Sequence, residues 1–235
     1  MIPIKGLQKT TLVDYPHTLA CTVFLGGCNF RCGYCYNRDL VLNPAKLATM
    51  PEEEFFAFLD SRKGFLEGVC ITGGEPTLWK DLPEFCRKIK ERGFLVKLDT
   101  NGTNPEMLKE LIARKLVDYV AMDVKAPLDS YEKAVAAKVE TAKIAESARI
   151  LLEGTIDYEF RTTVIPDQVD EQAILGIGQL IKGAKRYFLQ QFRPTETAID
   201  PRYQTMAPLL ASTLLKMQTL ARQYVDEVEV RNLSP

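Results

Sequence analysis

Residues 68–102, GVCITGGEPTLWKDLPEFCRKIKERGFLVKLDTNG, alternate between two secondary-structure patterns, and this alternation indicates the fold class. The apolar run GVCITGG (68–74) predicts a strand. DLPEFCRKIKERG (81–93) predicts a helix that ends on Gly93 as its C-cap, and FLVKLDTNG (94–102) returns to a strand pattern. A strand, a helix and a second strand in this order are typical of a parallel unit with a right-handed crossover.

The same alternation extends in both directions along the chain. Six strands are predicted, at residues 20–27, 68–74, 94–102, 117–127, 157–166 and 184–192. Helices are predicted at 51–64, 81–93, 105–115, about 131–152, 170–183 and about 205–224, with a short strand at 228–231. The fold class is therefore α/β with a parallel sheet, and both an open sheet and a partial barrel fit the pattern.

Polar runs follow several of the predicted strands. TGGEPT follows the second strand, DTNG the third and QQFRP the sixth, while DVK lies on the fourth. Ligands of parallel α/β folds bind where the strands end and the loops begin. We therefore expect the functional site at this edge of the sheet.

Composition narrows the classes of protein that the chain can represent. The chain has 235 residues, of which 46% are hydrophobic, so it can bury a sizeable core. Its 30 basic and 31 acidic residues give a net charge of -1, so nothing demands a nucleic acid or an anionic membrane as a partner. No apolar run approaches the roughly 20 residues that cross a bilayer, and residues 1–16 contain no signal-peptide pattern. We expect a cytoplasmic protein whose thiols stay reduced.

Three of the six cysteines, Cys28, Cys32 and Cys35, lie within eight positions of one another. Thiolates suit iron–sulfur clusters and zinc. A four-iron cluster normally takes four protein thiolates, so three would leave one iron open to a substrate or cofactor. Gly26, Gly27 and Gly33 would let the backbone wrap closely.

A zinc site is the alternative interpretation, with Cys21 or His17 as the fourth ligand. Cys21, Cys70 and Cys86 lie in apolar strand or helix patterns, which predicts that they are small buried hydrophobic residues.

The spacing Cys28-x3-Cys32-x2-Cys35, with Tyr34 before the last cysteine, resembles the signature of the radical S-adenosylmethionine (SAM) enzymes. GGEPT at 73–77 strengthens the likeness. LVDYP (12–16), LDTNG (98–102) and MDVKAP (122–127) resemble the glycyl-radical-enzyme activating proteins, most closely those of anaerobic ribonucleoside-triphosphate reductase. The resemblance is dense over residues 10–127 and implies a partial (β/α)6 barrel of the radical SAM fold.

The resemblance also implies one [4Fe-4S] cluster, ligated by Cys28, Cys32 and Cys35, whose open iron chelates SAM. Gly73 and Gly74 would approach the methionine amine, Tyr34 would face the adenine, and Glu75 would either contact ligand or hold the loop. Only Cys70 lies between Cys35 and Gly73, which leaves no room for the further clusters of some relatives.

Asp99, Asp123 and Lys125 match the positions that handle the ribose and the carboxylate of SAM. Asp123 and Lys125 are two residues apart, so they point to the same face of a strand, and the alternative is a surface ion pair. Asp99, Asp123 and Thr100 could also gather a monovalent cation, as in some relatives.

The sequence departs from the family pattern at two positions. His17 stands where glycine is frequent, and Tyr36 stands where histidine is frequent. Gln190 and Gln191 lie roughly where relatives contact adenosine, and a role in capping the sixth strand is the alternative.

Three hypotheses follow. The first is an activase that installs a glycyl radical on a partner, with anaerobic ribonucleotide reductase as the expected partner and flavodoxin or ferredoxin as the electron donor. The second is a radical SAM enzyme for a small molecule, such as a 7-carboxy-7-deazaguanine synthase, which a closed polar pocket over 192–203 would favour. The third is a zinc-binding interaction module. We expect one domain over 1–235, with its core at about 18–192 and a C-terminal loop, helix and short strand at 193–235.

Overall fold

The computed structural model describes residues 2–233, and eight strands of these residues belong to one sheet in which they follow chain order. The strands are β1 (Ile4–Thr11), β2 (Ala20–Leu25), β3 (Gly68–Gly73), β4 (Leu95–Thr100), β5 (Tyr119–Asp123), β6 (Asp157–Val164), β7 (Arg186–Gln191) and β8 (Glu227–Arg231). β1 runs antiparallel to β2, whereas β2–β3, β3–β4, β6–β7 and β7–β8 are parallel pairs. The mostly parallel sheet, alternating with helices, confirms the predicted α/β fold class.

The chain divides into two compact units. The first contains Met1–Asn29, Asp39–Thr100 and Glu106–Val120, and the second contains Phe30–Arg38, Asn101–Pro105 and Ala121–Pro235. Each unit is described by itself. The expectation of one domain over 1–235 stays a prediction.

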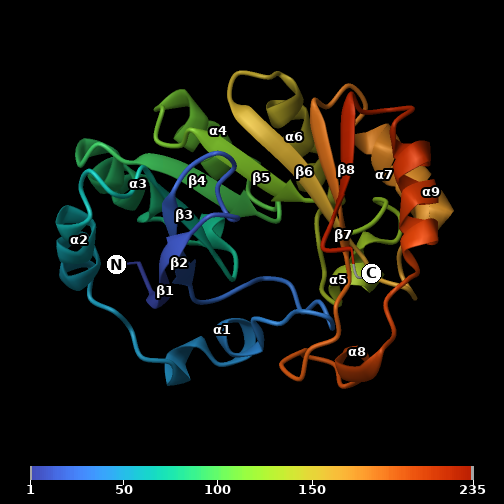
Figure 1. Ribbon diagram of the computed structural model, residues 1–235, viewed down its shortest axis with the longest axis horizontal. Coiled ribbons are helices and arrows are strands. Elements are labelled where there is room, and N and C mark those ends of the chain that lie inside the picture. The colour runs from blue at the N-terminus through green and yellow to red at the C-terminus, as the bar shows by residue number, and fades with distance from the viewer. Residues whose placement is uncertain (1, 234–235) are drawn as a thin grey trace. The chain divides into compact units, whose positions relative to one another are not determined.

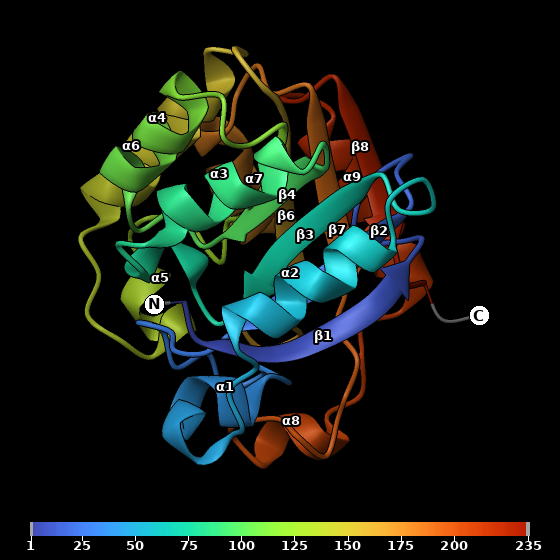
Figure 2. The ribbon, with the colours of Figure 1, turned by 90° about the vertical axis from the view of Figure 1, so that its left-hand side faces the viewer.

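The first unit holds the strands from β1 to β4 and the helices between them. These helices are α1 (Arg38–Leu42), α2 (Glu52–Ser61), α3 (Leu82–Glu91), most of α4 (Pro105–Ala113) and the 3-10 turns η1 (Pro44–Lys46) and η2 (Pro76–Leu78). Pro51 precedes α2. The negative charges of three glutamates in the first turn of α2 interact favourably with the positive end of its helix dipole. Phe55 and Phe56 of α2 pack against Phe85 of α3, and both helices can be followed in Figure 2.

Cys21, Cys70 and Cys86 are fully buried in β2, β3 and α3, which confirms their prediction as core residues. Burial raises the pKa of the Cys21 and Cys86 thiols to about 12, because the thiolate form loses its hydration. These thiols are structural and stay protonated.

β1, the long blue strand of Figure 2, was not predicted from the sequence. Its sequence IKGLQKTT is largely polar and its side chains alternate poorly between buried and exposed. Such a composition is typical of an edge strand, which needs only one partner and keeps much of its surface in water. β1 therefore lacks the apolar run that identified the other strands.

The second unit holds the end of β5, the strands from β6 to β8 and the remaining helices. These are α5 (Tyr131–Val135), α6 (Thr141–Leu152), α7 (Glu171–Leu180), α8 (Arg202–Thr205) and α9 (Ala211–Ala221). Figure 1 shows α9 beside α7 and β8, and Gly178 of α7 lets the Tyr224 ring approach where a Cβ would lie only 2.5 Å from it. The predicted C-terminal helix and short strand are thus confirmed, with the helix shorter than 205–224.

The predicted helical region over 131–152 is two helices. Ala136, the C-cap of α5, adopts a left-handed backbone with φ 49°, and α6 begins five residues later at Thr141. A left-handed residue ends a helix, and alanine gave no signal of it in the sequence.

No helix among residues 2–233 combines the length and the apolar character needed to cross a membrane.

Candidate active site

The loop Gly73–Glu75 packs against the segment that leads into Cys28, within the first unit. Gly74 N donates to Leu25 O and Glu75 N donates to Gly27 O, both at 2.8 Å. A Cβ on Gly74 would lie 1.9 Å from Gly27 O, and one on Gly73, whose φ is 116°, would lie 2.5 Å from Leu25 backbone atoms. Both glycines are therefore required by the fold itself, in addition to their predicted approach to an amine.

Glu75 holds this loop. Its side chain is 1% exposed, and its Oε1 accepts from Thr77 N, from Thr77 Oγ1 and from Thr100 Oγ1 at 2.8 Å. The carboxylate thereby caps η2 and ties it to the end of β4. This geometry supports the loop-holding alternative for Glu75, and a contact with ligand stays a prediction.

Trp79 fixes the residues just before Cys28. Its indole Nε1 donates to Gly26 O at 3.0 Å, and Gly27 N donates to Leu40 O at 2.8 Å. Cys28 follows directly on this clamped backbone and is partly exposed. Trp79 was not among the predicted site residues, although it is the chain's single tryptophan and follows GGEPT closely.

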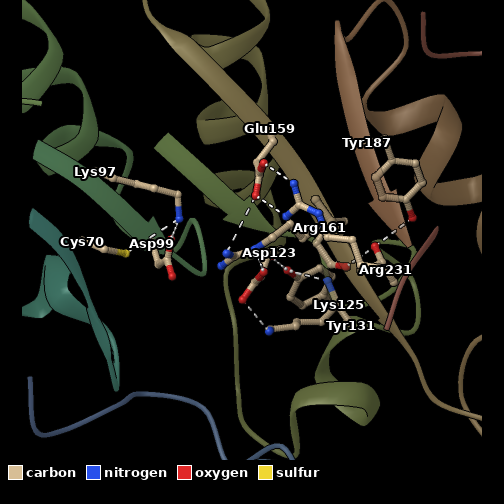
Figure 3. Close-up of polar contacts among 12 residues, drawn as sticks. Cys70, Lys97, Asp99, Asp123, Lys125, Tyr131, Glu159, Arg161, Tyr187 and Arg231 are labelled. Carbon is tan, nitrogen blue, oxygen red and sulfur yellow. Dashed lines mark hydrogen bonds and ion pairs between the residues drawn. The ribbon is translucent and has the colours of Figure 1, made fainter. Parts of the chain in front are cut away.

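Asp99 forms an ion pair with Lys97, which is 1% exposed within β4. Lys97 Nζ also lies 3.8 Å from Cys70 Sγ (Figure 3). A charge in the apolar strand FLVKL, two residues before Asp99, was the sequence signal for this pair. A ribose contact of Asp99 stays a prediction. A cation site formed by Asp99, Thr100 and Asp123 also stays a prediction, and the Thr100 hydroxyl donates to Glu75.

In the second unit, Asp123 lies between two cations. Its Oδ2 accepts from Lys125 Nζ at 3.0 Å, and its Oδ1 accepts from Arg161 Nε at 2.8 Å (Figure 3). The side chains of Asp123, Lys125 and Arg161 are 25%, 14% and 13% exposed, so the alternative of a surface ion pair does not describe them. Arg161 was not among the predicted site residues, and its sequence signal was a charge inside the strand pattern of 157–166.

Burial alone would raise the pKa of Asp123, but the charges of Arg161 and Lys125 outweigh it and hold that pKa well below its usual value. Burial likewise opposes the charged form of Lys125, and the Asp123 carboxylate nevertheless raises the lysine pKa above its usual range. Both groups are ionised at neutral pH.

Cys32 and Cys35 lie on one turn of the second unit, in which Cys35 N donates to Cys32 O at 3.0 Å. Burial raises the pKa of both thiols, and the positive charge of Lys125 works in the opposite direction on each. A cluster with thiolate ligands is anionic, so soft donors that feel the positive charge of Lys125 fit such a group chemically. Within residues 2–233 no three His, Cys, Asp or Glu side chains are arranged as a preformed metal site, so the ligand set of Cys28, Cys32 and Cys35 stays a prediction.

The segment after β7 packs onto this cysteine turn. Asp200 N donates to Gly33 O at 2.8 Å, and the Tyr34 ring meets the Tyr203 ring edge-on at 6.2 Å between centroids. Tyr203 belongs to a buried cluster with Ile165, Phe192 and Ala198, against which Tyr34 packs. Tyr34 thus has a packing role, and its predicted contact with adenine stays a prediction.

Gln190 and Gln191 have different environments at the end of β7. Gln191 is 5% exposed, and its Nε2 donates to Leu209 O at 2.8 Å. It therefore tethers the chain beyond α8, which agrees with a structural role, whereas Gln190 is partly exposed.

Comparisons with known proteins agree with this geometry. The Radical SAM superfamily matches residues 22–175. A candidate glycyl-radical enzyme activating enzyme of Methanocaldococcus jannaschii is 35% identical over 98% of this chain and 96% of its own length. A 7-carboxy-7-deazaguanine synthase of Thermococcus kodakarensis is 27% identical over 75% of each chain.

Solved structures share the fold at low sequence identity. SuiB of Streptococcus suis, bound to S-adenosylmethionine, superposes with a TM-score of 0.66 at 14% identity. The match covers 87% of this chain and 48% of SuiB, so this chain spans about half the length of that protein.

Proposed function

Because the chain belongs to the radical SAM superfamily, and is thus a radical SAM enzyme, we propose that it activates a glycyl-radical enzyme. The observation that carries the proposal is the 35% identity, over nearly the whole chain, with a candidate activating enzyme. The partner that we propose is anaerobic ribonucleoside-triphosphate reductase, with flavodoxin or ferredoxin as the electron donor and the cytoplasm as the location.

A [4Fe-4S] cluster, when bound, would supply the electron that splits the sulfonium of SAM into methionine and a 5′-deoxyadenosyl radical. That radical would take a hydrogen atom from a glycine of the partner, which leaves 5′-deoxyadenosine and a glycyl radical. Cys28, Cys32 and Cys35 would hold the cluster.

The residues around the predicted site have separable tasks in this proposal. Lys125 would pair with the methionine carboxylate, and Asp123 would hold Lys125 in place, because both of its oxygens are already engaged by cations. Gly73 and Gly74 would present backbone groups to the amine. Asp99, fixed by Lys97, would accept from the ribose.

A small-molecule radical SAM reaction is the second candidate, supported by the similarity to a 7-carboxy-7-deazaguanine synthase. We expected a closed polar pocket over 192–203 in that case. Phe192, Ala198 and Tyr203 instead form a buried, largely apolar cluster, which supports the activase. Membership of the superfamily also disfavours a zinc module without SAM chemistry.

The test is anaerobic incubation of the reconstituted enzyme with SAM, a reductant and the catalytic subunit of anaerobic ribonucleotide reductase. We expect a glycyl doublet in the electron paramagnetic resonance spectrum and 5′-deoxyadenosine in proportion to it. The Cys32→Ser variant is the control without product. In a parallel incubation that contains the substrate of 7-carboxy-7-deazaguanine synthases in place of the reductase subunit, formation of 7-carboxy-7-deazaguanine, with no glycyl doublet in the first incubation, would establish the second candidate instead.

A further inference from the structure

Glu159 on β6 is a carboxylate in the interior of the second unit, 1% exposed and held by two arginines. Arg231 of β8 engages it with both arms, Nη1 to Oε1 and Nη2 to Oε2, each at 3.0 Å. The Arg231 guanidinium also lies over the Phe188 ring, 3.3 Å from its centroid. The last strand is thus connected to the unit's interior by a bidentate pair of defined geometry.

Arg161 continues this chain of charges toward Lys125. Its Nη1 lies 3.9 Å from Glu159 Oε1, while its Nε donates to Asp123 Oδ1 at 2.8 Å. Arg161 therefore lies between two carboxylates and makes its close contact with Asp123 (Figure 3). The position of its guanidinium depends on how strongly Glu159 is engaged elsewhere.

We propose that Arg231 is a positioning residue for the SAM site, because it engages Glu159 and so leaves Arg161 bound to Asp123. This inference rests on the proposed role of Asp123 and Lys125 in SAM binding. Without Arg231, the buried Glu159 carboxylate would lose its bidentate partner, and the Arg161 guanidinium already lies 3.9 Å from it. Arg161 would move toward Glu159, and Asp123 would lose one of the two contacts that orient it beside Lys125.

The energetics favour positioning over simple stabilisation. Buried ion pairs are weak sources of stability, because desolvation of the charges offsets their attraction, and apolar replacements are often tolerated. The five alternating charges of Lys125, Asp123, Arg161, Glu159 and Arg231, of which only Glu159 is fully buried and Arg231 is 32% exposed, are therefore better explained by the geometry that they impose.

The test measures the dissociation constant of SAM on cluster-loaded protein by equilibrium dialysis. We expect Arg231→Met to raise it about tenfold, the loss of one well-oriented charged contact, and Glu159→Gln to raise it less than about threefold. The double variant Glu159→Gln/Arg231→Met should return to the Glu159→Gln value, because a neutral amide competes weakly for Arg161. In each variant, the spectrum of the reduced cluster should change on SAM addition at a SAM concentration that is higher than in the wild type by the same factor as the dissociation constant.

Arg186→Met is the matched control. Arg186 begins β7 and pairs with Asp157 at 3.4 Å, but Asp157 is 69% exposed, so SAM affinity should not change. If Arg231→Met does not fold, Arg231→Lys replaces it, since lysine keeps the charge without the bidentate pair.

The inference would be overturned if Arg231→Met bound SAM as tightly as the wild type. It would also be overturned if the double variant bound SAM as weakly as Arg231→Met. Failure of the proposed function is distinguishable: a wild-type enzyme that binds and cleaves SAM but yields no glycyl radical refutes the partner and leaves the role of Arg231 intact.

Discussion

Asp123 has a structural task in addition to the chemical task that we propose for it. Sequence spacing placed it beside Lys125 on one face of a strand, and the structure adds Arg161 on its other oxygen. The carboxylate is needed because two largely buried cations would otherwise repel each other. Its proposed task of holding Lys125 and its contribution to stability are therefore linked.

We expect Asp123→Asn to lower the free energy of unfolding of the apoprotein at pH 7 by about 3 kcal/mol, because Lys125 and Arg161 lose their shared partner. The pKa of Asp123 is depressed in the folded state, so its contribution is complete above the usual carboxyl value, about pH 4. It is lost progressively as the pH falls further, through the depressed pKa of the folded state, so in urea titrations the difference between wild type and variant should be constant above about pH 4 and shrink only below it.

The control for this prediction is Asp157→Asn, which removes a mostly exposed partner of Arg186 and should cost less than about 1 kcal/mol. A difference between wild type and Asp123→Asn that vanishes already at pH 6 would contradict the assignment.

At the scale of elements, apolar periodicity identified every central strand, because a parallel strand buried on both faces is a continuous apolar run. The same criterion missed β1, whose edge position permits polar residues, and it joined α5 to α6, because Ala136 carries no sequence signal of its left-handed backbone. His17 is the reverse case: the family resemblance predicted glycine at this position, and the His17 φ of 57° is a conformation that glycine adopts most readily.

The packing of 192–203 onto the cysteine turn was likewise beyond sequence patterns, because it depends on contacts between residues far apart in the chain. From the cysteine spacing, Gly33 was predicted to let the backbone wrap closely around a cluster. The structure assigns it to close approach by Tyr203, since a Cβ there would lie 2.6 Å from Tyr203 Cε2 and 3.1 Å from Asp200 Cβ.

Gly33→Ala should therefore displace the cysteine turn from the segment after β7. We expect overpacking of about 1–3 kcal/mol, a fall of several degrees in the thermal midpoint, and a lower content of iron and sulfide after anaerobic reconstitution. Tyr203→Leu in the same chain should restore part of the thermal midpoint and part of the iron and sulfide content, because it removes the atoms that clash.

Gly6→Ala is the matched control, since its Cβ would make an ordinary contact at 3.5 Å with Phe24. Equal iron content and equal midpoints in Gly33→Ala and Gly6→Ala would show that this packing does not support the cysteine turn.

For the whole molecule, the six cysteines separate into two classes by environment. Cys21, Cys70 and Cys86 are fully buried core residues, whereas Cys28 and Cys35 are partly exposed and Cys32 is 7% exposed. The spacing of the second class predicted a ligand set, and the apolar surroundings of the first class predicted core residues. The burial of the side chains confirms only the prediction that the first class belongs to the core.

The ligand prediction is tested by metal content in single serine variants purified without oxygen. Wild type should hold about four irons and four sulfides per chain, and Cys28→Ser, Cys32→Ser and Cys35→Ser should each lose most of both, because a hydroxyl is a poor replacement for a thiolate. Cys86→Ser is the control: its thiol is buried in α3, so the variant should lose stability but keep its iron. One zinc per chain in the wild type, or full iron retention without Cys28, would refute the three-thiolate cluster.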